Sequence, residues 1–206
     1  MDQEQRTDEW FKARLGKATA SRFADIMAKT RTGYGASRGN YLSQLVVERL
    51  TGTPTPGFTT DAMQWGIDEE ETAKTLYMLE TGSDVEDAFF VNHKTLQAGA
   101  SPDGYVSDDG LIEIKNPNTK THIETLRSGK VPSTYKWQIQ GQLWITERDW
   151  CDFVSADTRL PANARIFSRR VHRDNEERAE LEKEVRIFLE EVDQTVEFIK
   201  NYKGGI

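Results

Sequence analysis

The stretch Ser101–Lys115 reads SPDGYVSDDGLIEIK and contains two apolar runs separated by turn-forming residues. The runs Gly104–Val106 and Leu111–Lys115 are short enough for β-strands, and the Ser, Asp and Gly residues between them are typical of a turn. We therefore expect an antiparallel hairpin here. Such a hairpin would bring Asp103, at the turn before the first strand, beside Glu113 on the second.

The second strand of this hairpin carries charged residues that point to metal chemistry. Alternation along the strand places Glu113 and Lys115 on one face and Ile112 and Ile114 on the other. Two carboxylates held together need a cation, or one of them must take up a proton. Oxygen ligands of this type suit Mg²⁺, with Mn²⁺ as a substitute. Lys115 could then orient a water, help to deprotonate it, or stabilise charge on a phosphate. From the motif alone, a solvated face of a half-buried strand remains an alternative.

Outward from the hairpin, apolar periodicity predicts blocks of helices and strands. Helices are expected at 8–15, 21–29, 41–50, 61–79, 133–146 and about 175–202. Further strands are expected at 88–92, 98–101, 152–156 and 164–171, with loops at 30–40 and 51–58. The order helices, strands, helix, strands, helix indicates an α/β fold, in which helices flank a mixed central sheet within a single domain spanning 1–206.

Composition narrows the class of protein. The chain has 206 residues, of which 30% are charged and 36% hydrophobic, a balance typical of soluble domains. Its net charge of −7 argues against nonspecific coating of nucleic acid, although metal sites need carboxylates and a local basic patch could still bind DNA. Cys151 is the single cysteine, which excludes an internal disulfide and a Cys-rich zinc site. With no apolar run near the roughly 18 residues of a membrane span, and with a polar N-terminus, we expect a cytoplasmic protein and no membrane partner.

Two predicted helices carry polar residues that could face the same site. Glu70 lies in the acidic run Trp65–Glu71, which could equally be a solvated helix face. Gln138 and Gln142 are four residues apart and share one face of the helix at 133–146. Amide side chains that face inward need partners, and a water or a phosphate oxygen would serve.

Four segments together resemble the YqaJ-like viral recombinase family, which includes the phage lambda-type alkaline exonucleases and belongs to the PD-(D/E)XK nuclease superfamily. The resemblance extends from about Trp10 to Thr146, and the segments occur in the family's order and spacing. They are W-x3-RLG-x-x-TAS at 10–21, WG-x3-E at 65–70, SPDG-x8-E-x-K at 101–115 and YxxQxQGQLW at 135–144. The fold implied is restriction-endonuclease-like.

The resemblance implies a catalytic centre. Asp103, Glu113 and the backbone carbonyl of Ile114 match its metal ligands, and a second ion would share Asp103. Lys115 matches the catalytic lysine. Two residues from the helices complete the match: Glu70 as a glutamate near the metal, and Gln138 as the glutamine that helps to position the attacking water, with Gln140 as its alternative.

The resemblance also implies DNA contacts. Arg14, Ser21 and Ser101 match a pocket for the 5′-phosphate, Arg31 a loop arginine that enters the DNA groove, and Met63 an apolar wedge at the terminal base pair. Part of this agrees with simple chemistry, because the Arg14 guanidinium is a bidentate fork suited to phosphate. Ser21, if it begins a helix, would combine a hydroxyl with free N–H groups.

The implied activity is Mg²⁺-dependent, processive 5′→3′ digestion of one strand of linear double-stranded DNA. The products would be 5′-mononucleotides and a 3′ overhang. A ring-shaped homotrimer, a single-strand annealing protein as partner, and a phage or prophage origin follow from the same resemblance. Two alternatives remain: an endonuclease built on the same site, and a noncatalytic DNA-end-binding scaffold for recombination.

Overall fold

The computed structural model describes residues 7–57 and 60–204. The helices in that part of the chain are α1 (Asp8–Arg14), α2 (Phe23–Met27), α3 (Ala36–Thr51), α4 (Asp61–Asp68), α5 (Glu70–Thr81), α6 (Thr119–Ser128), α7 (Lys136–Thr146) and α8 (Asn175–Lys200). The strands are β1 (Ala18–Thr19), β2 (Lys29–Thr30), β3 (Gly33–Tyr34), β4 (Val85–Glu86), β5 (Val91–Asn92), β6 (Ala98–Ala100), β7 (Gly104–Val106), β8 (Gly110–Lys115), β9 (Trp150–Ala156) and β10 (Ile166–His172). Three short 3₁₀ turns join them, at Ala20–Arg22, Ser133–Tyr135 and Ala162–Ala164.

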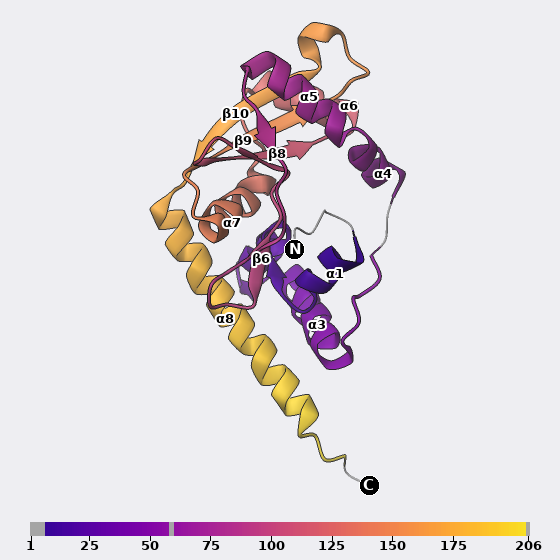
Figure 1. The fold of residues 1–206 in the computed structure, drawn as a ribbon. Coiled ribbons are helices and arrows are strands. Elements are labelled where there is room, and N and C mark those ends of the chain that lie inside the picture. The colour runs from indigo at the N-terminus through magenta and orange to yellow at the C-terminus, as the bar shows by residue number, and fades with distance from the viewer. Residues whose placement is uncertain (1–6, 58–59, 205–206) are drawn as a thin grey trace.

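The main sheet is mixed, as predicted, and its strand order is β10-β9-β8-β7-β4. Strands β7 and β8 form the expected antiparallel hairpin, while β8 and β9 run parallel. On one face, Ile112 and Ile114 pack with Tyr77 of α5. On the other face, Leu111 packs with residues of α7, so helices cover both sides of the sheet (Figure 1). Strand β8 is buried along almost its whole length because each of its faces meets a different helix.

A smaller sheet connects the N-terminal segment to the hairpin. Its order is β1-β6-β5, and β1 runs parallel to β6 with Ala18 opposite Ala98. Strand β6 ends at Ala100, immediately before the SPDG turn. This pairing therefore places the residues just before β1, near position 14, close to the start of the β7–β8 hairpin.

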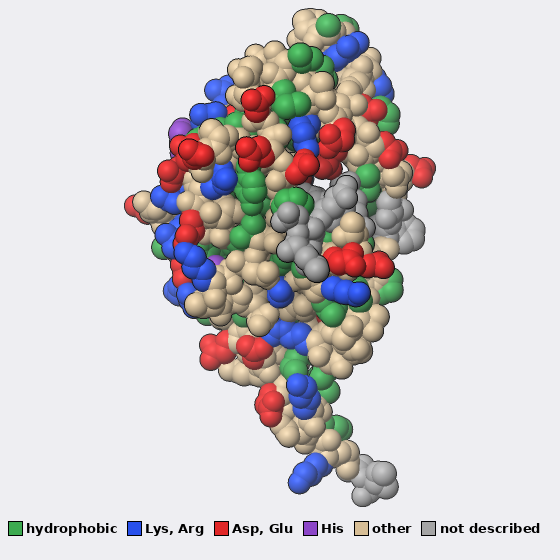
Figure 2. Space-filling view, viewed as in Figure 1, with side chains coloured by type: hydrophobic (Ala, Val, Ile, Leu, Met, Phe, Trp, Pro, Cys, Tyr) green, Lys and Arg blue, Asp and Glu red, His purple; other side chains and the backbone are tan. Residues whose placement is uncertain are grey.

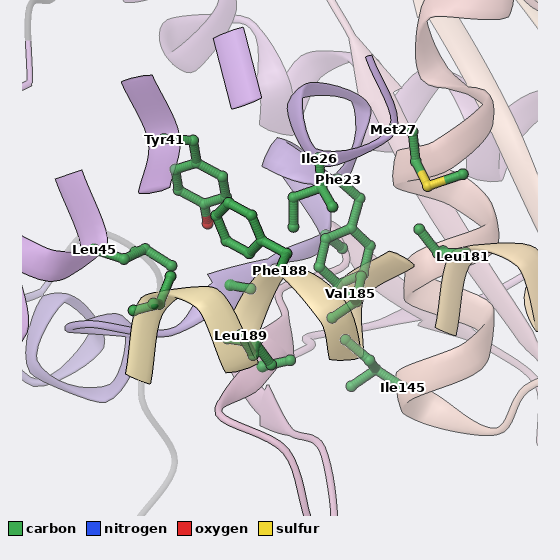
Figure 3. Close-up of a cluster of buried hydrophobic side chains, with 14 of the residues drawn as sticks. Phe23, Ile26, Met27, Tyr41, Leu45, Ile145, Leu181, Val185, Phe188 and Leu189 are labelled. Carbon is green, nitrogen blue, oxygen red and sulfur yellow. The ribbon is translucent and has the colours of Figure 1, made fainter. Parts of the chain in front are cut away.

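The largest hydrophobic cluster lies between α8 and the N-terminal helices. Phe188 stacks on Tyr41 with ring centroids 5.4 Å apart, and Phe23 and Ile26 of α2 pack into the same cluster (Figure 3). Leu181 of α8 is also fully buried there. The last turns of α8 project beyond the body of the molecule, where Phe198 and Tyr202 are exposed (Figures 1 and 2).

Several predicted boundaries were wrong. The helix expected at 61–79 is two helices that meet at Glu69. The side chain of Glu69 accepts a hydrogen bond from Thr158, in the loop after β9. The segment 30–40, expected to be a loop, contains most of the β2–β3 hairpin and the start of α3. Gly35 is the residue directly before that helix. The strand expected at 88–92 is only Val91–Asn92. The helix expected at 21–29 is a 3₁₀ turn followed by the short α2, so Ser21 does not begin an α-helix.

Other differences concern segments whose sequence has no clear apolar pattern. Helix α6 was not predicted, because its buried face uses His122 and Thr125 rather than an apolar stripe. The helix expected at 133–146 starts with a 3₁₀ turn, and the terminal helix ends at Lys200. Residues 1–6 and Phe58, the last residue of the predicted connector, lie outside the described residues. Across 7–57 and 60–204, none of the helices has both the length and the apolar character that crossing a membrane requires.

Candidate active site

The acidic centre, which we define as Asp103, Glu113 and Lys115, lies where β8 ends. Glu113 faces α7 and is 1% exposed. Its carboxylate accepts two short hydrogen bonds, from Gln138 Nε2 to Oε1 and from Gln142 Nε2 to Oε2, each 2.5 Å. The Lys115 ammonium also contacts Glu113 Oε1. Because residues four apart lie one above the other on a helix, both glutamines reach the same carboxylate.

Asp103 joins this centre from the turn before β7. Its backbone N–H donates to the carbonyl of Ile112 at 3.2 Å, which continues the hairpin ladder by one residue. Its Oδ2 accepts from the backbone N–H of Ile114 at 2.7 Å. The side chain is thus fixed beside Glu113, as the hairpin prediction required.

The acidic centre has two carboxylates, those of Asp103 and Glu113, but a single ammonium group, that of Lys115. Desolvation and the neighbouring Glu113 raise the pKa of Asp103 well above the ordinary aspartate range, against the effect of Lys115. For Lys115, desolvation alone would lower the pKa, but the Glu113 and Asp103 carboxylates outweigh it and raise the pKa overall. Lys115 is therefore a protonated ammonium in this state. The centre attracts positive charge.

The donor set fits a hard divalent cation. Two carboxylates and the carbonyl of Ile114 offer oxygen ligands, the type that Mg²⁺ and Mn²⁺ prefer. Within residues 7–57 and 60–204, no group of three His, Cys, Asp or Glu side chains gathers to hold a metal. An ion bound here would need backbone carbonyl or water oxygens besides the two acids, which is usual for Mg²⁺.

A cleft of about 560 Å³ opens over Asp103 and Lys115. One wall is formed by the end of β8, the residues Asn116 and Pro117 after it, and Tyr135. The opposite wall, which we call the α4 wall, consists of Met63, Gly66 and Ile67 of α4 and Glu70 at the start of α5; the cleft thus brings together Glu70 and Met63 with the acidic centre. Glu70 also contributes to raising the pKa of Asp103.

Helix α4 is attached to the body through three contacts, which we call the α4 contacts. All of its residues from Asp61 to Asp68 are described, and none is buried. Asn116 Nδ2 donates to the carbonyl of Gly66 at 3.0 Å. The Arg159 guanidinium lies 4.5 Å from the Trp65 ring centroid, and Thr158 Oγ1 donates to the Glu69 carboxylate at 2.8 Å. Sequence reasoning missed these residues, because polar residues after strands carry no pattern that indicates their partners.

A second hollow, the arginine pocket, surrounds half-buried Arg14 and has a volume of about 240 Å³. Arg14 Nη1 donates to Ser101 Oγ at 3.4 Å and Nη2 to Thr19 Oγ1 at 3.5 Å, while Thr19 Oγ1 lies 3.4 Å from Ser21 Oγ. Trp10 Nε1 also donates to Ser101 Oγ, at 2.9 Å. Desolvation lowers the pKa of Arg14 to about 10. The three residues predicted for phosphate binding are therefore neighbours, and Thr19 is an addition to them.

Two other predicted residues lie elsewhere. Gln140, the alternative to Gln138, points away from the acidic centre: its Nε2 donates to the carbonyl of His172 at 3.0 Å, and its Oε1 accepts from the backbone of Asp174 at 3.0 Å. The prediction of Gln140 is thus contradicted by its geometry. Arg31 is exposed in the turn between β2 and β3 and is not among the described residues that line the two hollows.

Comparisons with known proteins point the same way. A family model described as the YqaJ-like viral recombinase domain matches residues 9–149. Two crystal structures of the alkaline exonuclease LHK-Exo from Laribacter hongkongensis, one of them in complex with dAMP, are 49% identical to this chain. Each covers 94% of this chain and 96% of its own, with TM-scores of 0.89 and 0.88. A phage-related exonuclease from Haemophilus somnus 129PT shares the fold at 16% identity, with a TM-score of 0.70 over 89% of this chain and 96% of its own. No curated protein sequence matches the chain.

Proposed function

The chain belongs to the YqaJ-like viral recombinase family and has the fold of the alkaline exonucleases, and from this premise we propose that it is a Mg²⁺-dependent 5′→3′ exonuclease. It would digest one strand of linear double-stranded DNA processively, releasing 5′-mononucleotides and leaving a 3′ overhang for strand annealing. The observation that supports this most directly is the fixed position of the two acids: Asp103 is held by the Ile114 N–H, Glu113 contacts Lys115, and Asp103 and Lys115 line a cleft.

In this proposal the chain's own residues hold and orient the reacting groups. Asp103, Glu113 and the Ile114 carbonyl would hold the metal, and Asp103 would also serve a second ion. When bound, the metal would polarise the scissile phosphate and lower the pKa of the attacking water. Gln138 keeps the Glu113 carboxylate oriented through its 2.5 Å hydrogen bond. Lys115, which contacts Glu113 in the structure, would stabilise charge on the phosphate.

The remaining predicted residues bind the DNA. The arginine pocket receives the 5′-phosphate, since the half-buried guanidinium of Arg14 lies beside the hydroxyls of Ser101 and Thr19. Ser21 lies at the rim of the same hollow. Met63, 57% exposed over the cleft, separates the terminal base pair, and Arg31 contacts the duplex. One similar structure contains dAMP, a mononucleotide of the kind this reaction would release.

We further propose the assembly and the partner implied by the family. A homotrimer that encloses the DNA would explain processive digestion, because the substrate could not leave between cuts. A single-strand annealing protein would bind the 3′ overhang as it forms. Gel filtration of the 23.5 kDa chain distinguishes a monomer from a trimer directly.

The decisive experiment uses a 5′-phosphorylated linear duplex with Mg²⁺. We expect release of mononucleotides by the intact protein and loss of that release in Asp103→Ala and in Lys115→Ala, each with melting behaviour close to that of the unmodified chain. Arg14→Ala should slow digestion of phosphorylated ends more than of hydroxyl ends.

Each competing function gives a different result in the same assay. Nicking of closed circular DNA would indicate an endonuclease. Binding of DNA ends without cleavage, in Mn²⁺ as well as Mg²⁺, would indicate a scaffold and end the exonuclease proposal.

A further inference from the structure

Gln142 touches both halves of the proposed site. It lies on α7 one turn after Gln138 and is 1% exposed. Its Nε2 donates to Glu113 Oε2 at 2.5 Å and lies 3.5 Å from the backbone carbonyl oxygen of Ser101, a long contact. The Ser101 hydroxyl in turn accepts from Arg14. A continuous set of contacts therefore connects the arginine pocket to the acidic centre through one amide group.

The orientation of this amide is fixed at a cost in stability. Gln142 Oε1 is buried and has no hydrogen-bond partner among the described residues. A buried, unsatisfied acceptor costs about 1–3 kcal/mol. Turning the amide over would place its oxygen against the Glu113 carboxylate, where two acceptors repel each other. Nε2 must therefore face the acid. Gln142 leaves a buried acceptor unsatisfied while it holds a carboxylate. A role in the proposed site accounts for this arrangement better than a role in packing the core.

The helix that carries Gln142 cannot shift easily. Its neighbour Gly141 lies against Phe23, whose ring atom Cδ2 would be only 2.3 Å from a Cβ at that position. Leu143, on the other side of Gln142, is fully buried between the helix and the sheet. The backbone of α7 thus holds Gln142 at a set distance from both Glu113 and Ser101.

We propose that Gln142 is a positioning residue that fixes the separation between the arginine pocket and the acidic centre, and thereby sets the length of the fragment released at each cut. The inference rests on the proposed function, in which the pocket holds the 5′-phosphate and the centre cuts the next phosphodiester. A one-nucleotide product requires those two positions to stay one nucleotide apart. Loosening the contact between them broadens the product lengths.

The test compares two isosteric variants on the same helix, Gln142→Met and Gln140→Met. Both remove a buried amide, but Gln140 binds His172 and Asp174 instead of the site, so it controls for lost stability. Products from a 5′-phosphorylated linear duplex in Mg²⁺ are resolved by length, and rates are compared with those on a 5′-hydroxyl duplex. We expect Gln142→Met to release di- and trinucleotides and to lose about tenfold of its preference for phosphorylated ends, since small displacements in a site have effects of this order.

The outcomes separate the two proposals. If the unmodified chain releases no nucleotides, the proposed function fails before any variant is compared. If the unmodified chain releases mononucleotides and Gln142→Met does so with the same phosphate preference, the role of Gln142 is refuted. Gln142→Asn, whose shorter amide cannot reach both partners, is the second variant if Gln142→Met does not fold; single-nucleotide products from it would also refute the proposal. Gln140→Met should keep the unmodified product pattern, and broadened products from it would show a general effect of α7.

Discussion

The two walls of the cleft are held in different ways. On one side the wall includes the end of β8, where the neighbouring Glu113 is bound by two glutamines of α7, a helix that is itself packed on the core. On the other side, no residue of α4 is fully buried, and the α4 contacts attach this helix to the body. Buried packing fixes geometry strongly, whereas polar contacts that are only partly buried contribute little energy each. Under the proposed function, we expect the reaction to depend on the rigid wall and the binding of DNA to depend on the other wall.

The largest effect is expected from Glu113→Gln on the rigid wall. The variant removes a charged ligand and leaves one oxygen for the amide donors of Gln138 and Gln142. We expect the initial rate of nucleotide release to fall by at least about 10³-fold, the scale seen when one preorganised group is removed from an active site. Glu69→Gln, at one of the α4 contacts, is the matched control and should lose less than about tenfold. Equal losses in both variants would contradict the division between the walls.

A smaller effect, on stability, is expected from Gly141→Ala. The added methyl would meet the Phe23 ring and push α7 away from its place, which should lower the free energy of unfolding by about 1–3 kcal/mol. Gly39→Ala, in α3, meets nothing within 4 Å and should raise stability by about 0.5–1 kcal/mol instead. Denaturant titration measures both changes. Stability unaffected in Gly141→Ala would mean that α7 is not rigidly held.

At the α4 contacts, Arg159→Ala should act on binding rather than on the chemical step. Losing its stacking on Trp65 removes about 1 kcal/mol or less, so the KM for DNA ends should rise about fivefold while kcat stays near its original value. Arg159→Lys should restore little, since an ammonium lacks the planar fork. Steady-state kinetics on a short duplex give both constants. A fall in kcat with unchanged KM would show that α4 belongs to the reacting centre.

The smallest effect concerns the residue that holds Arg159. Asp157 is buried and accepts from Arg159 Nε at 2.7 Å and from Thr119 Oγ1 at 2.6 Å, and Arg159 foremost lowers the pKa of Asp157 to about 2. A lowered carboxyl pKa stabilises the fold above the unfolded-state pKa near 4, and this contribution disappears as the pH falls toward 2. Arg159 is half-exposed, so we expect Asp157→Asn to cost only about 1 kcal/mol at pH 7. The difference from the unmodified chain should shrink between pH 4 and pH 2 in urea titrations; a difference independent of pH would contradict the ion pair.

A feature could be predicted from the sequence when the residues that determine it lie close together in the chain. The β7–β8 hairpin and the shared face of Glu113 and Lys115 follow from turn residues and two-residue alternation, and the structure confirms both. The contact of Asn116 with Gly66 spans 50 residues and that of Thr158 with Glu69 spans 89, and no local pattern encodes such pairs. The roles assigned to Arg31 and Met63 stay predictions.

The parallel pairing of β8 with β9 has a consequence for a chain during its synthesis. Parallel neighbours require a crossover, here containing α6 and α7, so the strand that ends at Lys115 gains its second neighbour only after residue 150 has been made. The residues that line the arginine pocket all precede the hairpin, while Gln138 and Gln142 come after it. A growing polypeptide that ends before β9 therefore lacks the second neighbour of β8, and under the proposed function its acidic centre is complete only once β9 has been made.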